Sequence, residues 1–89
     1  MEERTLLTCE IGDTFKITRI EENNETRNYL FSLEFLKNTD LLVVQKNKDI
    51  LILEVFGSRL GIESQLSSNI FGYVKKDILI KSKKYDPNY

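Results

Sequence analysis

The sequence predicts a small, mainly β domain, a barrel or sandwich of about five strands with one helix. Three observations predict this class. Apolar residues fill both faces of residues 50–56, alternate with polar residues along 14–20, and recur at helical spacing in 26–36. Because a strand that is apolar on both faces lies in the middle of a structure, we expect residues 41–62 to form the centre of the domain.

The central segment 41–62 is expected to hold three strands. The polar run 45–49 predicts a turn between the first two, and Gly57-Ser58 predicts a tight turn before the third, at 59–62. One face of the middle strand is expected to point inward and comprises Leu51, Leu53 and Val55. The other face, Ile50, Ile52 and Phe56, is expected to meet the helix or another subunit.

The segments on either side complete the predicted sheet. Gly12 supplies a turn before a strand at 14–20, with a bulge or strand end at Ile20, where the alternation changes phase. Ser64 is placed to cap a single helical turn at 65–69 before a last short strand at 70–74. The triplet 78–80 predicts an added edge strand between lysines. We expect one domain over 1–82 and a flexible tail over 83–89.

The helix is predicted over residues 26–36. Asn23 or Asn24 is a suitable N-cap, and Asn38 is suited to a left-handed position after the helix ends. The apolar stripe expected to be buried contains Tyr29, Leu30, Leu33 and Leu36. Phe31 and Phe35 flank this stripe and are expected to widen it, the alternative being an exposed aromatic pair.

The residue types and motifs that the sequence lacks limit the functions that we expect. The 89 residues contain no histidine and one cysteine, so Ser-His-Asp and Cys-His catalytic arrangements cannot form, and no nucleotide-binding glycine motif or CxxC pair is present. We therefore expect no enzyme activity, no cofactor and no metal. Cys9 is expected to be an apolar filler, and Glu21, Glu22 and Glu25 a solvated loop rather than a cation site.

Hydropathy and charge limit the cellular location and the classes of partner that we expect. No apolar run approaches the roughly 20 residues that span a bilayer, and acidic residues stand where a signal peptide needs basic ones, so we expect a cytoplasmic protein with no membrane insertion. The net charge of −1 gives no reason to expect nucleic acid as the main partner. The lysine-rich C-terminal segment, with Tyr73 and Tyr85 nearby, keeps a nucleic-acid-binding barrel open as an alternative.

A set of short matches runs from about Leu6 to Val74. They are Leu6 and Leu7 before Gly12, Arg27 near the helix start, Leu33-Glu34-Phe35, Lys37-Asn38-Thr39, Gly57 before Leu60-Gly61-Ile62, and Ile70-Phe71. This pattern resembles that of the FeoA family. Glu34 and Asn38 stand where the family has glycines, and Lys37 where it has proline. Because Glu34 adopts a left-handed conformation only with strain, we expect the helix to run further, or to end differently, than in the family.

The resemblance implies an SH3-like β-barrel with the helix packed on it. It also implies a non-enzymatic accessory protein of ferrous iron uptake that binds, and supports or regulates, a FeoB-type transporter on the cytoplasmic side. The alternative function is that of a FeoA-like regulatory domain that binds a repressor or a peptide. Association of the protein with further copies of itself also stays open. The residues expected to contact the partner are Arg27, Glu34, Lys37, Asn38, Gly57, Ser58 and Arg59. The competing interpretation is that Arg27 and Arg59 only pair with nearby acids, at roughly 0 to 1 kcal/mol each.

Overall fold

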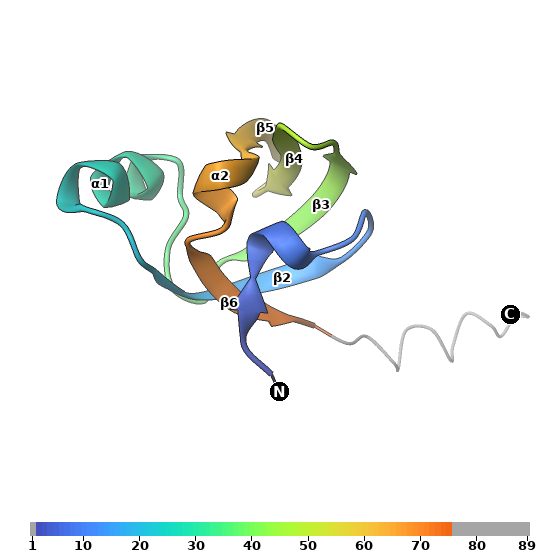
Figure 1. Ribbon diagram of the computed structural model, residues 1–89, viewed down its shortest axis with the longest axis horizontal. Coiled ribbons are helices and arrows are strands. Elements are labelled where there is room, and N and C mark those ends of the chain that lie inside the picture. Colours follow the sequence, from blue (N-terminus) through green and yellow to red (C-terminus); the bar gives the residue numbers. More distant parts are fainter. Residues whose placement is uncertain (1, 76–89) are drawn as a thin grey trace, which may run out of the picture.

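The structure, a computed structural model, describes residues 2–75 and confirms a mainly β fold with one principal helix. All neighbouring strands are antiparallel, in the order β1-β6-β2-β3-β4-β5 (Figure 1). Among the described residues the sheet is not closed, and β1 and β5 are its edges. The strands are β1 (Arg4–Thr5), β2 (Thr14–Ile20), β3 (Asp40–Lys46), β4 (Ile50–Val55), β5 (Ser58–Glu63) and β6 (Ile70–Val74). The edge strand expected at 78–80 and the tail 83–89 lie outside the described residues.

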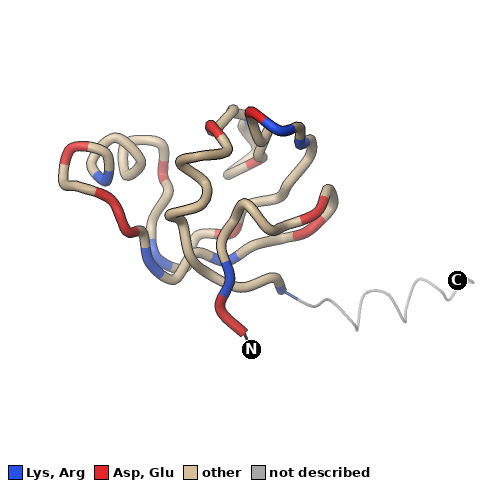
Figure 2. Tube along the Cα trace, in the orientation of Figure 1, with Lys and Arg blue, Asp and Glu red and all other residues tan. Residues whose placement is uncertain are grey.

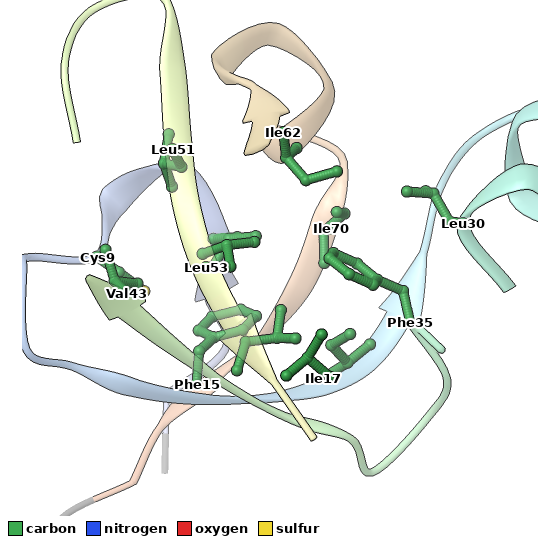
Figure 3. Packing of buried hydrophobic residues seen from close by; sticks show 13 residues of the cluster. Cys9, Phe15, Ile17, Leu30, Phe35, Val43, Leu51, Leu53, Ile62 and Ile70 are labelled. Atoms are coloured by element: carbon green, nitrogen blue, oxygen red, sulfur yellow. The ribbon is translucent and has the colours of Figure 1, made fainter. Parts of the chain in front are cut away.

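The core lies inside the curve of this sheet (Figure 3). The inward row predicted for β4 is confirmed, since Leu51 and Leu53 are fully buried and Val55 nearly so. Other fully buried members are Leu6, Cys9, Phe15, Ile17, Leu30, Phe35, Leu41, Val43 and Ile70. Burial raises the pKa of the Cys9 thiol to about 11, so the side chain stays protonated at neutral pH and packs as an apolar group.

The other face of β4 departs from expectation. Ile50 and Ile52 are half-buried, and their side chains lie over Gly61 of β5, where a Cβ atom would meet Ile50 Cδ1 at 2.8 Å. Phe56 stands beyond the strand end and is 76% exposed. Figure 1 shows α1 to one side of the sheet rather than over β4. The expected contact of this row with the helix is therefore wrong, and contact with another subunit stays a prediction.

Turn chemistry shapes the connections as predicted. Gly12 has a φ of 97°, which favours glycine. In the β3–β4 turn, Asn47 Oδ1 accepts hydrogen bonds from the backbone N–H groups of Asp49 and Ile50, at 2.8 and 2.9 Å. The strand β2 ends at Ile20, which confirms one of the two alternatives predicted there, and a register shift lies earlier, between Ile17 and Arg19.

The principal helix, α1 (Asn24–Ser32), begins where the capping signal predicted. The Asn23 side chain accepts a 2.8 Å hydrogen bond from the Thr26 backbone N–H, a cap that stabilises a helix by about 1 kcal/mol. The helix ends at Ser32 rather than Leu36. Leu33 is its C-cap, and the next residue, Glu34, takes the left-handed conformation with a φ of 71°.

This early end corrects the predicted buried stripe. Because the chain reverses at Glu34, Phe35 turns into the core and is fully buried, as Figure 3 shows. Leu30 is also buried, and Leu33 is partly so. Tyr29, Leu36 and Phe31 are 55%, 42% and 40% exposed, and their predicted burial is wrong. Glu34 therefore takes the left-handed conformation that we expected the chain to avoid.

Two short helices complete the fold. The 3-10 turn η1 (Leu6–Thr8) follows β1, and α2 (Ser64–Ser67) connects β5 to β6. The N-cap of α2 is Glu63, one residue before the predicted Ser64, whose buried hydroxyl has no hydrogen-bond partner among the described residues. No helix in the 2–75 range is long and apolar enough to cross a membrane.

Candidate functional site

The residues predicted to bind a partner lie in two segments, one from α1 through the loop after it and one at the β4–β5 turn. The register of β3 with β4 pairs Leu42 with Glu54. The first residues of β3, which follow the loop, therefore lie beside the last residues of β4, which precede the turn. The fold thus brings both predicted segments to the same end of the β3–β4 pair.

A groove of about 250 Å³ separates α1 and the loop after it from β2. We call it the α1–β2 groove. Its lining residues are Ile17, Thr18, Arg19, Ile20, Arg27, Phe31 and Lys37. Figure 2 shows the basic positions of β2 and of the loop after α1 close together, at the side of the sheet where α1 lies. Two of the predicted residues, Arg27 and Lys37, therefore line one cavity with three residues of opposite chemical character, the apolar Ile17, Ile20 and Phe31.

The three cations of the groove differ in what they contact. Arg19 forms ion pairs with Glu3, at 3.0 Å, and with Glu21, and its guanidinium lies 4.0 Å from the centre of the Phe71 ring. The hydrogen bond from Arg19 lowers the pKa of the Glu3 carboxyl, so this pair stays charged well into the acid range. The charge of Arg19 is thus compensated within the protein.

Arg27 and Lys37 carry charges that no described acidic residue compensates. Neither forms a salt bridge with any residue in 2–75. The Arg27 guanidinium lies 5.8 Å from the centre of the Phe31 ring, within the range of a cation–π contact. Both side chains are exposed at the rim. The groove therefore presents two positive charges beside an apolar surface.

The remaining predicted residues of the loop shape it. Glu34 is exposed and forms the left-handed step after α1. Asn38, with a φ of 74°, donates its backbone N–H to the Ile17 carbonyl at 2.7 Å, and its carbonyl accepts from Lys16 Nζ at 3.2 Å. These bonds attach the loop to β2 and so fix one wall of the groove.

At the β4–β5 turn, Gly57 has a φ of 81°, and exposed Ser58 begins β5. Arg59 lies 3.5 Å from Glu54 across the strands, with 68% of its side chain exposed. This pair agrees with the competing interpretation of Arg59 as a solvated ion pair, worth at most about 1 kcal/mol.

Two aromatic residues were missing from the predicted site. Phe31 follows Arg27 by one helical turn, a spacing that places both on one helix face and could have been used to find it. Phe56 precedes Gly57 and has a φ of 51°, an unusual conformation for a bulky residue, while its ring is 76% exposed. Positive φ at a non-glycine residue depends on the hairpin geometry, so sequence pattern alone did not indicate it.

A larger cavity, of about 720 Å³, lies at the other end of the β3–β4 pair, between its turn and the start of α2. Its one lysine, Lys48, shares the lining with two acids, Asp49 and Glu63, and no aromatic residue is present. None of the predicted residues lines it. Within residues 2–75, no group of three histidine, cysteine, aspartate or glutamate side chains is placed to hold a metal ion.

Comparisons with known proteins agree with this fold. The chain is similar to the crystal structure of an iron uptake regulatory protein, FeoA, with a TM-score of 0.78 and 19% identity, over 83% of this chain and 100% of that one. A FeoA-like protein from Clostridium acetobutylicum gives a TM-score of 0.76 and 18% identity, over 86% and 92% of the two chains. A manganese-dependent transcriptional repressor gives 0.78 and 18%, over 84% of this chain and 38% of the repressor.

At these identities the structural similarities establish the fold alone. A search among the curated proteins gives no match. The family comparison reaches further, because the model of the FeoA domain matches residues 4–74, which include every strand and helix described above and the whole α1–β2 groove. The chain belongs to the FeoA family.

Proposed function

We propose that this protein is a non-enzymatic, cytoplasmic accessory protein of ferrous iron uptake that binds the cytoplasmic side of a FeoB-type transporter and supports or regulates transport. FeoA domains are linked to iron transport. The observation that carries the proposal is the match of this domain over residues 4–74. The α1–β2 groove, with Arg27 and Lys37 uncompensated at its rim, supplies a surface suited to a protein partner.

Direct binding tests this proposal. The purified cytoplasmic domain of a FeoB-type transporter, immobilised and supplied with this protein at tens of micromolar, should retain it. An unrelated protein of similar size and charge is the control and should pass through. Failure to retain this protein under these conditions, with the domain shown to be folded, contradicts the proposed partner.

A second function, as a regulatory domain that binds a repressor or a peptide, has one supporting observation. The chain shares its fold with 38% of the manganese-dependent repressor. Size-exclusion chromatography of this protein mixed with the transporter domain, or with a metal-dependent repressor from the same genome, separates the two functions. Co-elution with the repressor alone would favour the regulatory function.

A further inference from the structure

The α1–β2 groove combines features that select the chemistry of a ligand. Its floor contains the buried Ile17 and the half-buried Ile20, and Phe31, with 40% of its surface exposed, forms a wall. The rim carries Arg27 and Lys37, which come from α1 and from the loop after it. A ligand that matches this groove has an apolar part for the floor and a negative charge within reach of the rim.

The volume of the groove excludes most small-molecule ligands. Cavities that hold cofactors or drug-sized molecules are roughly 300 to 1,000 Å³, and the groove is about 250 Å³. A space of this size holds one or two side chains of a peptide. A bare phosphate would use the two cations but would leave Ile20 and Phe31 uncovered, so the apolar surface favours a peptide.

The uncompensated charges also favour an anionic partner. Arg19 already has Glu3, Glu21 and the Phe71 ring as partners. Arg27 and Lys37 have no such acidic partner within residues 2–75. A carboxylate near both would make two charge-assisted hydrogen bonds, which are stronger than neutral ones. The exposed aromatic and arginine at one site are also the residue types enriched in interfaces.

We propose that the α1–β2 groove binds a short segment of a partner protein in which an apolar residue such as leucine neighbours an acidic residue. The apolar side chain lies on Ile20 and Phe31, and the carboxylate lies at Arg27 and Lys37. This inference rests on the proposed function only for the identity of the partner. The chemistry of the segment follows from the groove itself. Two kinds of measurement therefore test the segment and the partner separately.

The first measurement uses peptides and no transporter. The ¹⁵N-labelled protein is titrated with acetyl-Leu-Asp-Leu-amide and, as a matched control, with acetyl-Leu-Asn-Leu-amide, which has the same shape without the charge. The aspartate peptide should shift the backbone amide signals of Thr18, Arg27, Phe31 and Lys37, and bind about fivefold or more tightly than the asparagine peptide. Equal binding of the two peptides, or shifts confined to other residues, would overturn the proposal.

The second measurement uses the transporter domain with three forms of the protein. Arg27→Gln/Lys37→Gln removes both rim charges, and Lys48→Gln removes an exposed charge at the β3–β4 turn as a control. The double variant should bind the domain at least tenfold more weakly, by about fivefold for each charge, while the control binds like the unchanged protein. Amide spectra of each variant establish that it is folded.

The outcomes separate the two proposals. If the unchanged protein binds the transporter domain and the double variant binds it equally well, the groove inference is wrong and the proposed function stands. If the unchanged protein does not bind the domain, the proposed function fails, and the peptide titration still decides the groove. Competition by millimolar inorganic phosphate at constant ionic strength would also overturn the inference, because it would identify a phosphate site.

Discussion

Within residues 2–75, three residues other than glycine have positive φ angles, and each lies where the chain changes direction near the predicted partner surface. They are Glu34, Asn38 and Phe56, with φ angles of 71°, 74° and 51°. Asparagine accepts this conformation more readily than the other two. At Glu34 and Phe56 the surrounding structure holds the strained conformation, because the reversal at Glu34 places Phe35 in the core and the turn at Phe56 joins two paired strands.

The strain at Glu34 leads to a stability prediction. Glu34→Gly should raise the free energy of unfolding by about 0.5 to 1 kcal/mol, because a left-handed residue with a side chain costs about 1 to 2 kcal/mol and glycine loses part of this gain in unfolded-state entropy. Urea unfolding measures the change. Lys37→Gly, in the same loop without a positive φ, should leave stability unchanged or lower it. A loss of stability in Glu34→Gly would show that the carboxylate side chain contributes more than its strain costs.

Close packing requires a glycine at position 72. A Cβ atom there would lie 2.0 Å from the Lys16 carbonyl oxygen, in the backbone of the neighbouring strand β2. Gly72→Ala should therefore lower the free energy of unfolding by about 3 kcal/mol or more, since the strands must separate. The added methyl of Gly61→Ala meets side-chain atoms only, the nearest being Ile50 Cδ1 at 2.8 Å with Ile52 Cδ1 at 3.4 Å, and should cost less than about 1 kcal/mol. Equal losses in urea unfolding would contradict this packing argument.

At the scale of elements, α1 is attached to the sheet through few side chains. Leu30 is its one fully buried residue, and Phe35 is buried just after its end, as Figure 3 shows. The position of Arg27 and Phe31 relative to β2, and therefore the shape of the α1–β2 groove, depends on these two anchors.

This attachment predicts a large effect at one helix position and a small effect at its neighbour. Leu30→Ala should lower the free energy of unfolding by about 2 to 4 kcal/mol, because it leaves a cavity between α1 and the core. Tyr29→Ala, at a 55% exposed position of the same helix, should change it by less than about 0.5 kcal/mol. Chemical unfolding of both variants checks the difference, and similar losses would mean that Tyr29 has a structural role its exposure does not indicate.

Elements with a local signal in the sequence were predictable. The strands at 14–20 and 70–74, the inward row of β4 and the Asn23 cap follow from alternation and capping chemistry, and the structure confirms them. The end of α1 was not predictable from the sequence. Glutamate disfavours the left-handed conformation locally, and tertiary packing holds Glu34 in it. The two-residue strand β1 was not predicted as a strand, because it is defined only by its pairing with β6, which is distant in the sequence.

Two of the residues named from the sequence, Arg27 and Lys37, line the α1–β2 groove, but the sequence did not indicate the cavity itself. Arg27 and Lys37 were named from the resemblance to the FeoA family. Ile17 and Ile20, which line the same groove, belong to the strand β2 that precedes α1 in the chain. Only the folded chain brings these four residues together. The predicted Asn38 and Arg59 have partners within the chain instead, Asn38 on β2 and Arg59 on β4, and the sequence alone does not distinguish such pairing from contact with a partner protein.

At the scale of the whole molecule, one carboxylate connects three strands on the outer face of the sheet. Asp40, at the start of β3, lies 3.2 Å from Lys16 Nζ of β2 and 2.9 Å from Nζ of Lys75, the residue after β6. Partial burial opposes the charge of Asp40, but hydrogen bonds from Lys75 and Lys16 outweigh it and hold the pKa of the carboxyl below its usual value.

The lowered pKa of Asp40 predicts a pH dependence of stability with a definite sign. Because the folded protein binds the Asp40 proton more weakly than the unfolded chain, the stabilisation is present above the ordinary pKa of about 3.9 and is lost as pH falls through the lowered pKa. Asp40→Asn should therefore lower the free energy of unfolding by up to about 1 kcal/mol at pH 7, a limit set by solvent screening of this 41% exposed side chain.

The difference in stability between Asp40→Asn and the unchanged protein should shrink below about pH 4. It should also shrink in 1 M salt at neutral pH, because salt screens exposed charges. Asp49→Asn removes a carboxylate with no salt bridge in the described part of the chain and is the control for the salt dependence, which it should not show. Urea unfolding between pH 2.5 and 7 measures all three proteins, and a deficit of Asp40→Asn that persists unchanged at the lowest pH would mean that its cost is steric rather than electrostatic.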